Sequence, residues 1–483
     1  MAKKKMTLEE KLEEAIVKDV PYEVPNNWIW SNVGSISIEI KNGTTIKQNK
    51  DETGIKVTRI EALQNNRIDL NRLGTIIETE KIKEQDYYID GDIALSHINS
   101  LEHVGKTALI DNSLLPLVHG MNLLRIRVNK RMILPKYFQL YTRGYDYKKF
   151  VVDRVNRAVN QVSLNQKNLS NIPIPISPLK EQQRIVDKIE SLFEKLDKGK
   201  ELIEEARDDF EKRKSAILEK AFRGELTKEW RKKNQISNNF LESLLNQNKK
   251  IKKNFKFSPA TEIYVLPKKW KWIKLKDCCE KFKYGTSSKS KEEGRIPVLR
   301  MGNLQEGKLD WSNLVYTSDE DEIKKYQLIS GDLLFNRTNS PELVGKTSIY
   351  EGEREAIYAG YLIRVRTLND INSKFINYFM NSIFAKHRCM EVKSDGVSQS
   401  NINAEKLGDF DIPLPPIEEQ KEIVRILDNL LEDESKINEL TALEEQIDLI
   451  KKSILAKAFR GQLGTNCEED ESALELLKEI LNT

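Results

Sequence analysis

The sequence is poor in the residues and motifs from which most catalytic and metal sites are built. Its 483 residues include four cysteines and four histidines, which show neither the spacing of metal ligands nor a disulfide framework. It has no glycine-rich cofactor loop and no Asn-Pro-Pro-aromatic motif, since isoleucine follows its one Pro-Pro pair, Pro415-Pro416. We therefore expect this chain to have no catalytic activity, no bound metal and no cofactor of its own.

Long hydrophobic runs are also absent. No apolar stretch approaches the ~18 residues of a membrane-spanning helix, and the basic start at 3–5 is not followed by the apolar segment of a secretory signal. Together with the cysteine pattern, this predicts a cytoplasmic protein in a reducing compartment. The hydrophobic content of 39% is sufficient for packed cores in a chain of this length.

What the sequence does contain is a tandem repeat. Ala-Phe-Arg-Gly occurs at 221–224 and again at 458–461, and a Glu-Gln pair followed by Ile-Val begins at 181 and at 419. Further matches, such as Val-Gly-Lys-Thr at both 104–107 and 344–347, recur at nearly the same offset along the chain. The offsets predict a duplication of one unit of about 240 residues.

Each unit ends in a long helix. Apolar residues there recur at steps of three and four, each helix follows a proline, and each stops at a glycine. About 40 helical residues extend roughly 60 Å, and such a narrow apolar seam needs a partner helix. The partner is either the other copy in the same chain, as an antiparallel pair, or a second chain in a dimeric coiled coil. The expected seam and end-motif residues are Ile185, Ile189, Leu192, Leu196, Phe222, Arg223, Ile423, Leu430, Leu440, Phe459 and Arg460.

The remainder of each unit reads as a globular α+β domain. Short β-branched and aromatic runs alternate with helical pieces such as 135–145 and 373–390, which favours a mainly antiparallel sheet. Leucine-rich patches at 240–245 and 473–477 suggest that the tail and the N-terminal segment play the part in one half that the linker plays in the other. That would place the chain ends close together in a pseudo-twofold arrangement. The expected segments are 1–23 (N-terminal helical segment), 24–177 (first domain), 178–226 (first long helix), 227–265 (linker), 266–414 (second domain), 415–464 (second long helix) and 465–483 (tail helix).

The net charge of +4 conceals an uneven distribution. Residues 24–176 carry 21 Lys and Arg against 15 Asp and Glu, and the linker carries nine against three. The tail has one basic residue against six acidic ones. Basic domains joined by neutral or acidic helices are compatible with polyanion binding, although solvated surfaces give similar counts.

Two motifs suggest other chemistry, and their context argues against it. A phosphate-binding loop needs a glycine five positions before its second glycine, whereas both Val-Gly-Lys-Thr motifs have a serine there. A turn between strands, whose lysine can face an anion, is favoured. His97 and His103 are close in sequence, but the second copy has Arg337 and Leu343 at those positions. A catalytic histidine pair is therefore not favoured.

Polar residues that recur in the loops of both copies are candidates for nucleic-acid contacts. Arg, Gln and Asn can form paired hydrogen bonds with base edges, and Lys and Ser reach phosphates. Residues shared by both copies can equally be shared because both domains need them to fold, and if the copies read different sequences, the reading residues should differ. The candidates are Thr44, Thr45, Arg59, Gln64, Asn99, Lys106, Asn160 and Gln161 in the first copy, and Thr286, Ser287, Arg300, Gln305, Arg337, Asn339, Lys346, Ser398 and Gln399 in the second.

With these motifs in place, the chain resembles the specificity subunit of type I restriction–modification enzymes over nearly its whole length. The resemblance rests on the duplicated domains, on the Pro-X-X-X-Gln-X-X-Ile-Val pattern that opens each long helix, and on the Ala-Phe-Arg-Gly-Glu-Leu motif that closes it. Gln462 replaces the glutamate in the second closing motif, and the seam of the second helix contains polar residues.

The resemblance implies two α/β target-recognition domains separated by two long helices in an antiparallel coiled coil. It further implies a bipartite double-stranded DNA target with one domain per half-site. The expected partners are two modification subunits that methylate adenine N6 with S-adenosylmethionine, and restriction subunits that use ATP and Mg²⁺; no membrane partner is expected. The alternative is a coiled-coil adaptor whose duplicated domains bind protein or carbohydrate. Salt-dependent DNA binding separates the two.

Overall fold

The computed structural model describes residues 6–49, 53–158, 161–234, 264–396, 399–431 and 434–482. The chain divides into two compact units, one of residues 1–203 with 441–483 and the other of residues 204–440. Both long helical regions contribute to both units. These are α5 (Leu179–Phe222), a single helix of 44 residues, and the pair α13 (Ile417–Leu431) and α14 (Glu434–Ala458). None of the described helices is both long and apolar enough to cross a membrane.

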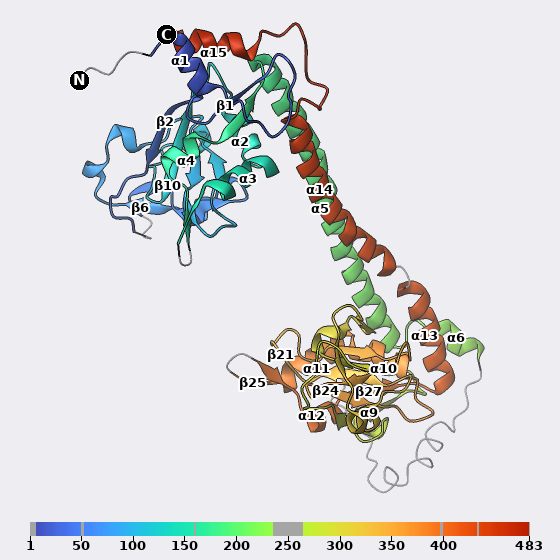
Figure 1. Ribbon diagram of the computed structural model, residues 1–483. Coiled ribbons are helices and arrows are strands. Elements are labelled where there is room, and N and C mark those ends of the chain that lie inside the picture. Colours follow the sequence, from blue (N-terminus) through green and yellow to red (C-terminus); the bar gives the residue numbers. More distant parts are fainter. Residues whose placement is uncertain are drawn as a thin grey trace. The chain divides into compact units, whose positions relative to one another are not determined.

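The first unit is built on a four-stranded antiparallel sheet (Figure 1). Both faces of this sheet are buried, because side chains alternate along a strand and each face meets its own apolar cluster. Ile93, Leu95 and Leu124 belong to the main core, whereas Ala94 and Leu123 pack in a smaller cluster on the opposite face. The strand order is β2 (Ser37–Asn42), β10 (Leu123–Val128), β7 (Ile93–Ser96) and β9 (Thr107–Leu109).

Smaller ladders and three helices complete the first domain. The ladders are β1 (Ile29–Asn32) with β13 (Pro173–Ile176), β3 (Ile55–Val57) with β6 (Gly74–Ile76), β4 (Leu63–Gln64) with β5 (Arg67–Ile68), and β8 (Ile98–Asn99) with β12 (Val162–Ser163) and β11 (Asn156–Arg157). The helices are α2 (Pro135–Tyr141), α3 (Tyr145–Arg154) and α4 (Gln166–Ser170).

The second domain repeats this plan. Its four-stranded sheet is ordered β15 (Lys283–Tyr284), β24 (Leu362–Val365), β20 (Leu333–Asn336) and β22 (Thr347–Ile349). The matching ladders are β14 (Lys271–Lys274) with β27 (Asp411–Leu414), β17 (Leu304–Gln305) with β18 (Lys308–Leu309), β16 (Ile296–Leu299) with β19 (Val315–Thr317) and β23 (Ile357–Tyr358), and β21 (Thr338–Asn339) with β26 (Ser400–Asn401) and β25 (Ser394–Asp395). The helices are α9 (Glu320–Tyr326), α10 (Ser373–Met380), α11 (Ile383–Val392) and α12 (Ala404–Gly408).

The predicted α+β class with a mainly antiparallel sheet is confirmed. Among the named strands of the described residues, only β16 and β23 pair in parallel. The helical pieces expected at 135–145 and 373–390 are each divided into two shorter helices, with α3 and α11 extending beyond the expected ends.

Within the first unit, α5 and α14 pack against each other in antiparallel fashion. Lys451 forms an ion pair with Asp197, and Lys200 lies 3.9 Å from Asp448, so residue numbers rise along one helix as they fall along the other. Gly199 faces Ile447. The partner of the first helix here is therefore the second helix of the same chain, as the intramolecular alternative predicted.

The strict heptad seam predicted from the sequence is wrong where these helices lie on the domains. Leu430 is 44% exposed and Leu431 only 5%. Leu192 and Leu196 are half-buried, whereas Phe193, which is outside the predicted seam, is buried. These helix segments pack on a globular domain as well as on a helix. A helix that faces a globular core needs a wider apolar stripe than the narrow seam of a coiled coil. The buried stripes are Ile185, Val186, Ile189 and Phe193 in α5, and Ile423, Val424, Leu427 and Leu431 in α13.

This corrected stripe predicts different effects for two adjacent leucines. Leu431→Ala is expected to lower the free energy of unfolding by about 2–4 kcal/mol, because it removes a side chain from the core of the second domain. Leu430→Ala, at the neighbouring exposed position, is expected to change it by less than about 0.5 kcal/mol. Urea denaturation of both variants measures the difference. Equal destabilisation would show that Leu430 is a buried residue of the helix seam.

The Ala-Phe-Arg-Gly motif that ends each long helix packs on the domain of the other copy. Phe459 at the end of α14 makes edge contacts with Tyr137 and Tyr141 of the first domain, with ring centroids 5.1 Å apart in both cases. Phe222 at the end of α5 contacts Phe375 and Phe379 of the second domain in the same way, at 5.4 and 5.1 Å. The adjacent arginines repeat the pattern: Arg460 lies 4.7 Å above the Tyr22 ring and Arg223 lies 4.9 Å above Tyr264.

The Glu-Gln pair at the start of each helix is buried and fixes the helix to its own domain. Glu181 accepts hydrogen bonds from Trp28 Nε1 (2.7 Å), Asn466 Nδ2 (3.0 Å) and Thr465 Oγ1 (3.2 Å). Glu419 accepts from Trp270 Nε1 (3.0 Å) and Thr227 Oγ1 (2.6 Å) and also forms an ion pair with Arg231, which follows in α6 (Lys228–Lys233). Gln182 and Gln420 hydrogen-bond backbone groups.

The two glutamate sites therefore differ in charge compensation. Glu419 has a guanidinium partner, whereas the hydrogen-bond donors to Glu181 are neutral. Burial raises the pKa of Glu181, and the hydrogen bonds from Trp28, Asn466 and Thr465, together with the nearby charge of Arg184, offset this only in part. The difference comes from the segments that follow the two long helices. The basic α6 follows α5 and supplies Arg231 to Glu419, whereas the acidic tail follows α14 and supplies Thr465 and Asn466 to Glu181.

The N-terminal segment and the tail pack together, as the sequence predicted. Helix α1 (Leu8–Ala15) lies against α15 (Ala473–Asn482), Lys11 Nζ donates to the carbonyl of Leu481 at 2.6 Å, and the Ala473 N–H donates to the Asn27 carbonyl at 3.0 Å. The leucine patch at 240–245, its proposed counterpart in the linker, lies outside the described residues.

Candidate nucleic-acid interface

Three loops of the first domain meet where backbones approach too closely for side chains. A Cβ added to Gly43 would lie 1.9 Å from the Gly120 carbonyl oxygen, and one added to Gly120 would lie 1.7 Å from the Thr58 oxygen. In the second domain, a Cβ at Gly285 would lie 2.2 Å from the Tyr358 oxygen. Gly43 recurs as Gly285 because the fold leaves no room for a side chain there, whereas Ala359 takes the place of Gly120 in the second copy.

The threonine after each glycine is held by the same contact. The Thr44 N–H donates to the His119 carbonyl at 2.9 Å, and Thr286 donates to Tyr358 at the same distance. The Thr286 hydroxyl is buried and hydrogen-bonds Glu322. The next residues, Thr45 and Ser287, are exposed. Of the four predicted hydroxyl contacts, only these last two therefore present their side chains openly to a ligand.

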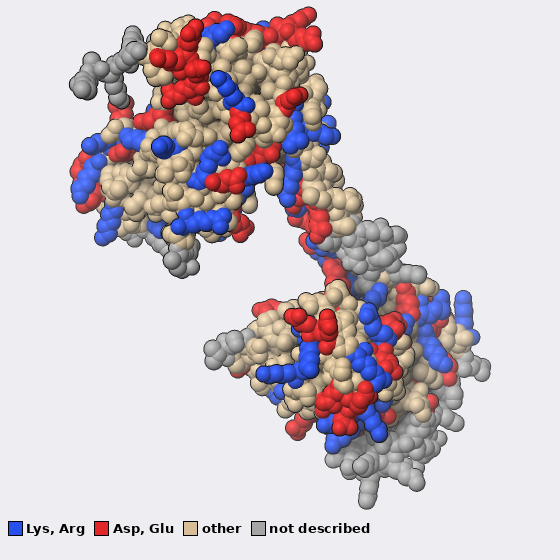
Figure 2. Space-filling view, viewed as in Figure 1, with Lys and Arg blue, Asp and Glu red and all other residues tan. Residues whose placement is uncertain are grey.

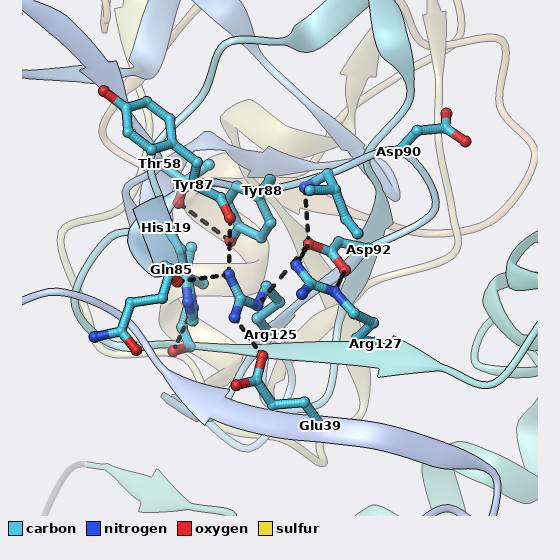
Figure 3. Close-up of polar contacts among 12 residues, drawn as sticks. Glu39, Thr58, Gln85, Tyr87, Tyr88, Asp90, Asp92, His119, Arg125 and Arg127 are labelled. Atoms are coloured by element: carbon cyan, nitrogen blue, oxygen red, sulfur yellow. Dashed lines mark hydrogen bonds and ion pairs between the residues drawn. The ribbon is translucent and has the colours of Figure 1, made fainter. Parts of the chain in front are cut away.

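A buried arginine lies beneath these loops (Figure 3). Arg125 is only 1% exposed because it points from β10 into the small cluster on the far side of the sheet. Its Nη1 donates to the Gln85 carbonyl at 3.1 Å and to the Tyr87 carbonyl at 2.8 Å, and Nη2 forms an ion pair with Glu39. Although partial burial opposes it, Arg125 lowers the pKa of Glu39. Arg125 is thus occupied inside the domain and is unavailable to a polyanion.

The network extends to the loop with His119 and Thr58. Burial, reinforced by the charge of Arg125, lowers the pKa of His119 to about 3, so the imidazole is neutral near pH 7. Thr58 Oγ1 accepts from the Gly120 N–H at 2.9 Å. A second arginine, Arg127, donates two hydrogen bonds of 2.8 Å to the Asp92 carboxylate, and Arg366 and Asp332 repeat this pair at 2.6 Å in the second domain. These contacts hold the loops that carry Thr58 and His119 firmly on the sheet.

Three predicted residues of the first domain do come together. Gln64, Asn99 and Lys106 line one pocket of ≈ 240 Å³. Asn99 lies in β8, directly opposite Val162 of β12, and the exposed Gln161 is the residue before Val162. The other lining residues are Ile60, Glu61, Leu63, Ser96 and His103.

The corresponding residues of the second domain also meet, with different bonds. Lys346 Nζ donates to Gln305 Oε1 at 3.2 Å. Asn339 lies opposite Ser400 in the β21–β26 pair, which places the exposed Gln399 near it. Both domains therefore place a Gln beside a Lys, and the Asn of each lies on an equivalent short ladder.

The predicted arginines have internal partners. Arg59 forms a 2.8 Å ion pair with Glu61, which itself lines the pocket. Arg300 donates to the Asn313 carbonyl at 3.2 Å. Arg337 stacks over the Tyr284 ring at 4.8 Å, and its buried Nε has no partner among the described residues. Asn160 and Ser398 lie outside the described residues.

Sequence reasoning missed the other five lining residues of the pocket, of which Glu61, Ser96 and His103 are polar. The signal for His103 was present in the comparison of the copies, because Leu343 stands at the equivalent position. This difference argues against a catalytic histidine pair, and a difference between copies is also what selective reading of two sequences requires.

Charge alone does not locate the interface. In the face that Figure 2 shows, Lys and Arg side chains are interspersed with Asp and Glu side chains on both units. The described residues contain no group of three or more His, Cys, Asp or Glu placed to hold a metal ion. We call the surface that carries Gln64, Asn99 and Lys106, and its equivalent with Gln305, Asn339 and Lys346, the loop face of each domain. It is distinguished by its amide side chains and its lysine, rather than by a dominant charge.

The family model for the type I restriction modification DNA specificity domain matches residues 25–206 and 267–447. This chain belongs to that family. The two matches each include one globular domain and much of a long helix, so each repeat of the sequence is one specificity domain with its helix.

Curated relatives agree with this assignment, and solved structures share the fold. The type I restriction enzyme MjaX specificity subunit of Methanocaldococcus jannaschii is 30% identical over 93% of this chain and 97% of the relative. The EcoKI specificity subunit of Escherichia coli is 26% identical over 91% of this chain and 90% of that subunit. Among structures, the HsdS subunit of Thermoanaerobacter tengcongensis shares the fold with a TM-score of 0.50 at 19% identity, over 92% of this chain and all of HsdS. A chain from a structure of a type I R-M system has a TM-score of 0.64 at 19% identity, over the same coverage.

Proposed function

We propose that this chain is the sequence-reading subunit of a type I restriction–modification complex. Its two specificity domains would each bind one half of a bipartite double-stranded DNA target. The observation that supports this most directly is the duplicated loop face, where a Gln, an Asn and a Lys occupy matching strands and loops of two domains that the family model matches separately. Gln and Asn suit base edges, and Lys suits phosphates or guanine.

The same proposal assigns the chemistry to other subunits. Two modification subunits would methylate adenine with S-adenosylmethionine, and restriction subunits would cleave DNA with ATP and Mg²⁺. This chain would supply DNA recognition and a scaffold, without catalytic residues of its own. Relatives that carry the name of specificity subunits support that division. They favour DNA recognition over the adaptor alternative, in which the duplicated domains would bind protein or carbohydrate.

Exchange of one domain tests the proposal. Replacing residues 24–170 with the corresponding segment of another family member, in the complex with modification subunits, is expected to change one half of the methylated site. The reason is that each domain has its own core and its own loop face. Sequencing of methylated positions in treated DNA measures the result.

The matched control is the exchange of 266–407, the equivalent segment of the second domain, which is expected to change the other half only. The chain without modification subunits serves as the negative control and is expected to transfer no methyl groups. An exchange that altered both halves, or neither, would contradict one domain per half-site.

A further inference from the structure

The equivalent lysines of the two domains differ at one contact, and this difference coincides with the change of a single neighbouring residue. In the first domain, Lys106 Nζ lies 2.6 Å from Nδ1 of His103. In the second, Leu343 replaces the histidine, and Lys346 turns to Gln305 Oε1 instead. The equivalent lysines thus have different partners on the same scaffold. The neighbouring residue that differs between the two copies is His103 in the first and Leu343 in the second.

The contact defines which ring nitrogen of His103 faces a ligand. A lysine ammonium has no acceptor, so Nδ1 must accept a hydrogen bond from it and the ring hydrogen lies on Nε2. Gln64 Nε2 donates to the Glu61 carbonyl at 2.9 Å, which leaves its Oε1 toward the pocket. The pocket therefore offers an imidazole N–H and a lysine ammonium as donors, with an amide oxygen beside them.

The loop that carries His103 is held firmly in the first domain. Lys148 of α3 donates to the carbonyls of Leu101 (3.0 Å), Glu102 (2.9 Å) and Val104 (2.9 Å), which surround the histidine. In the second domain Lys386 stands at the equivalent position of α11, and it is exposed. Leu343 there is 41% exposed. A positioned donor in one domain thus corresponds to an accessible apolar side chain in the other.

We infer that His103 and Leu343 are specificity-determining residues that occupy the same place in the two domains and read different bases. This inference rests on the proposed function. The His103 Nε2–H of the first pocket matches an acceptor of guanine, N7 or O6, in the major groove, whereas the leucine matches the C5-methyl group of thymine. Lys106 and Lys346, which both copies retain, contribute affinity that is shared between sequences.

The test uses the full chain assembled with its modification subunits and a DNA library randomised over both half-sites. His103→Leu is expected to replace a guanine preference by a thymine preference at one position of the first half-site, with a change of about five- to tenfold in relative binding. The second half-site is expected to stay unchanged. Leu343→His is expected to produce the converse change at one position of the second half-site. His103→Gln retains a side-chain donor and is expected to keep most of the guanine preference.

Lysine variants separate selective reading from general affinity. Lys106→Met and Lys346→Met are expected to weaken binding similarly for all sequences and to reduce the slope of log affinity against log salt by about one. If His103→Leu binds DNA with wild-type base preferences, or alters only the second half-site, the inference is overturned. A wild-type complex that binds without any base preference would overturn the proposed function as well.

Discussion

Glu419→Gln is expected to lower the free energy of unfolding by about 3 kcal/mol, whereas Glu181→Gln is expected to change it by less than about 1 kcal/mol. Glu419 is fully buried and its charge compensates Arg231, so a glutamine would leave the guanidinium without its anion and place an amide N–H against other donors. At Glu181 every hydrogen-bond donor is neutral, and a glutamine oxygen can accept from Trp28 and Asn466 in the same way. Two residues with the same motif position thus have opposite electrostatic requirements.

Denaturant unfolding at pH 7 measures this difference, with the exposed Glu418→Gln as the matched control. Dependence on pH adds an independent readout for Glu181. Its folded-state pKa is raised, so the folded protein holds the proton more tightly than the unfolded chain. The contribution of Glu181 to stability is therefore complete below the unfolded pKa and is lost as pH rises through the folded pKa.

Glu181→Gln removes that loss, because glutamine does not titrate. The variant is expected to gain stability relative to wild type as pH rises above the ordinary glutamate range. Equal effects of the two glutamine substitutions, or a pH-independent difference at Glu181, would show that the neighbouring charges do not distinguish the two sites.

Matched insertion of seven residues in both long helices is expected to lengthen the unread gap between the half-sites by about three base pairs. Seven residues add roughly 10.5 Å of helix, and DNA rises about 3.4 Å per base pair. The insertions are placed near Ile203 in α5 and near Leu440 in α14, where a whole heptad preserves the apolar seam. Because neither insertion touches a loop face, both half-site sequences are expected to stay unchanged.

The measurement is the mapping of methylated sites with the variant complex. A four-residue insertion in α5 alone is the control, since it rotates one seam against the other and is expected to impair folding or assembly. A matched variant that folds and methylates sites with the original gap would show that the helices do not set the spacing.

Local pattern was sufficient for several features. The repeat of the Glu-Gln and Ala-Phe-Arg-Gly motifs indicated the duplication, and the punctuation by proline and glycine located the long helices to within a few residues. These features depend on residues that are close together in sequence, and the periodicity of apolar residues indicates such local structure directly. The shared polar loop residues were also found in this way, because the copies could be compared position by position.

Other features depend on residues that are far apart in the chain. Arg125 alternates along β10 like a solvent-facing residue, yet a second apolar cluster covers that face of the sheet and buries it. Leu430 fits a heptad, but the domain beneath α13 selects Leu431. Spacing along one segment carries no information about what covers it from elsewhere.

Comparison of the two sequence copies is enough to predict a duplicated unit of α+β domain and long helix, and to find the polar residues that the copies share. The packing of each helix end on the domain of the other copy, with Phe459 on Tyr137 and Phe222 on Phe375, is visible only in three dimensions. The tertiary structure likewise decides which shared residues are already engaged inside the domains and which still face a pocket. The physical reason is that hydrogen bonds and packing saturate side chains across hundreds of residues, and a side chain engaged in this way is unavailable to a ligand.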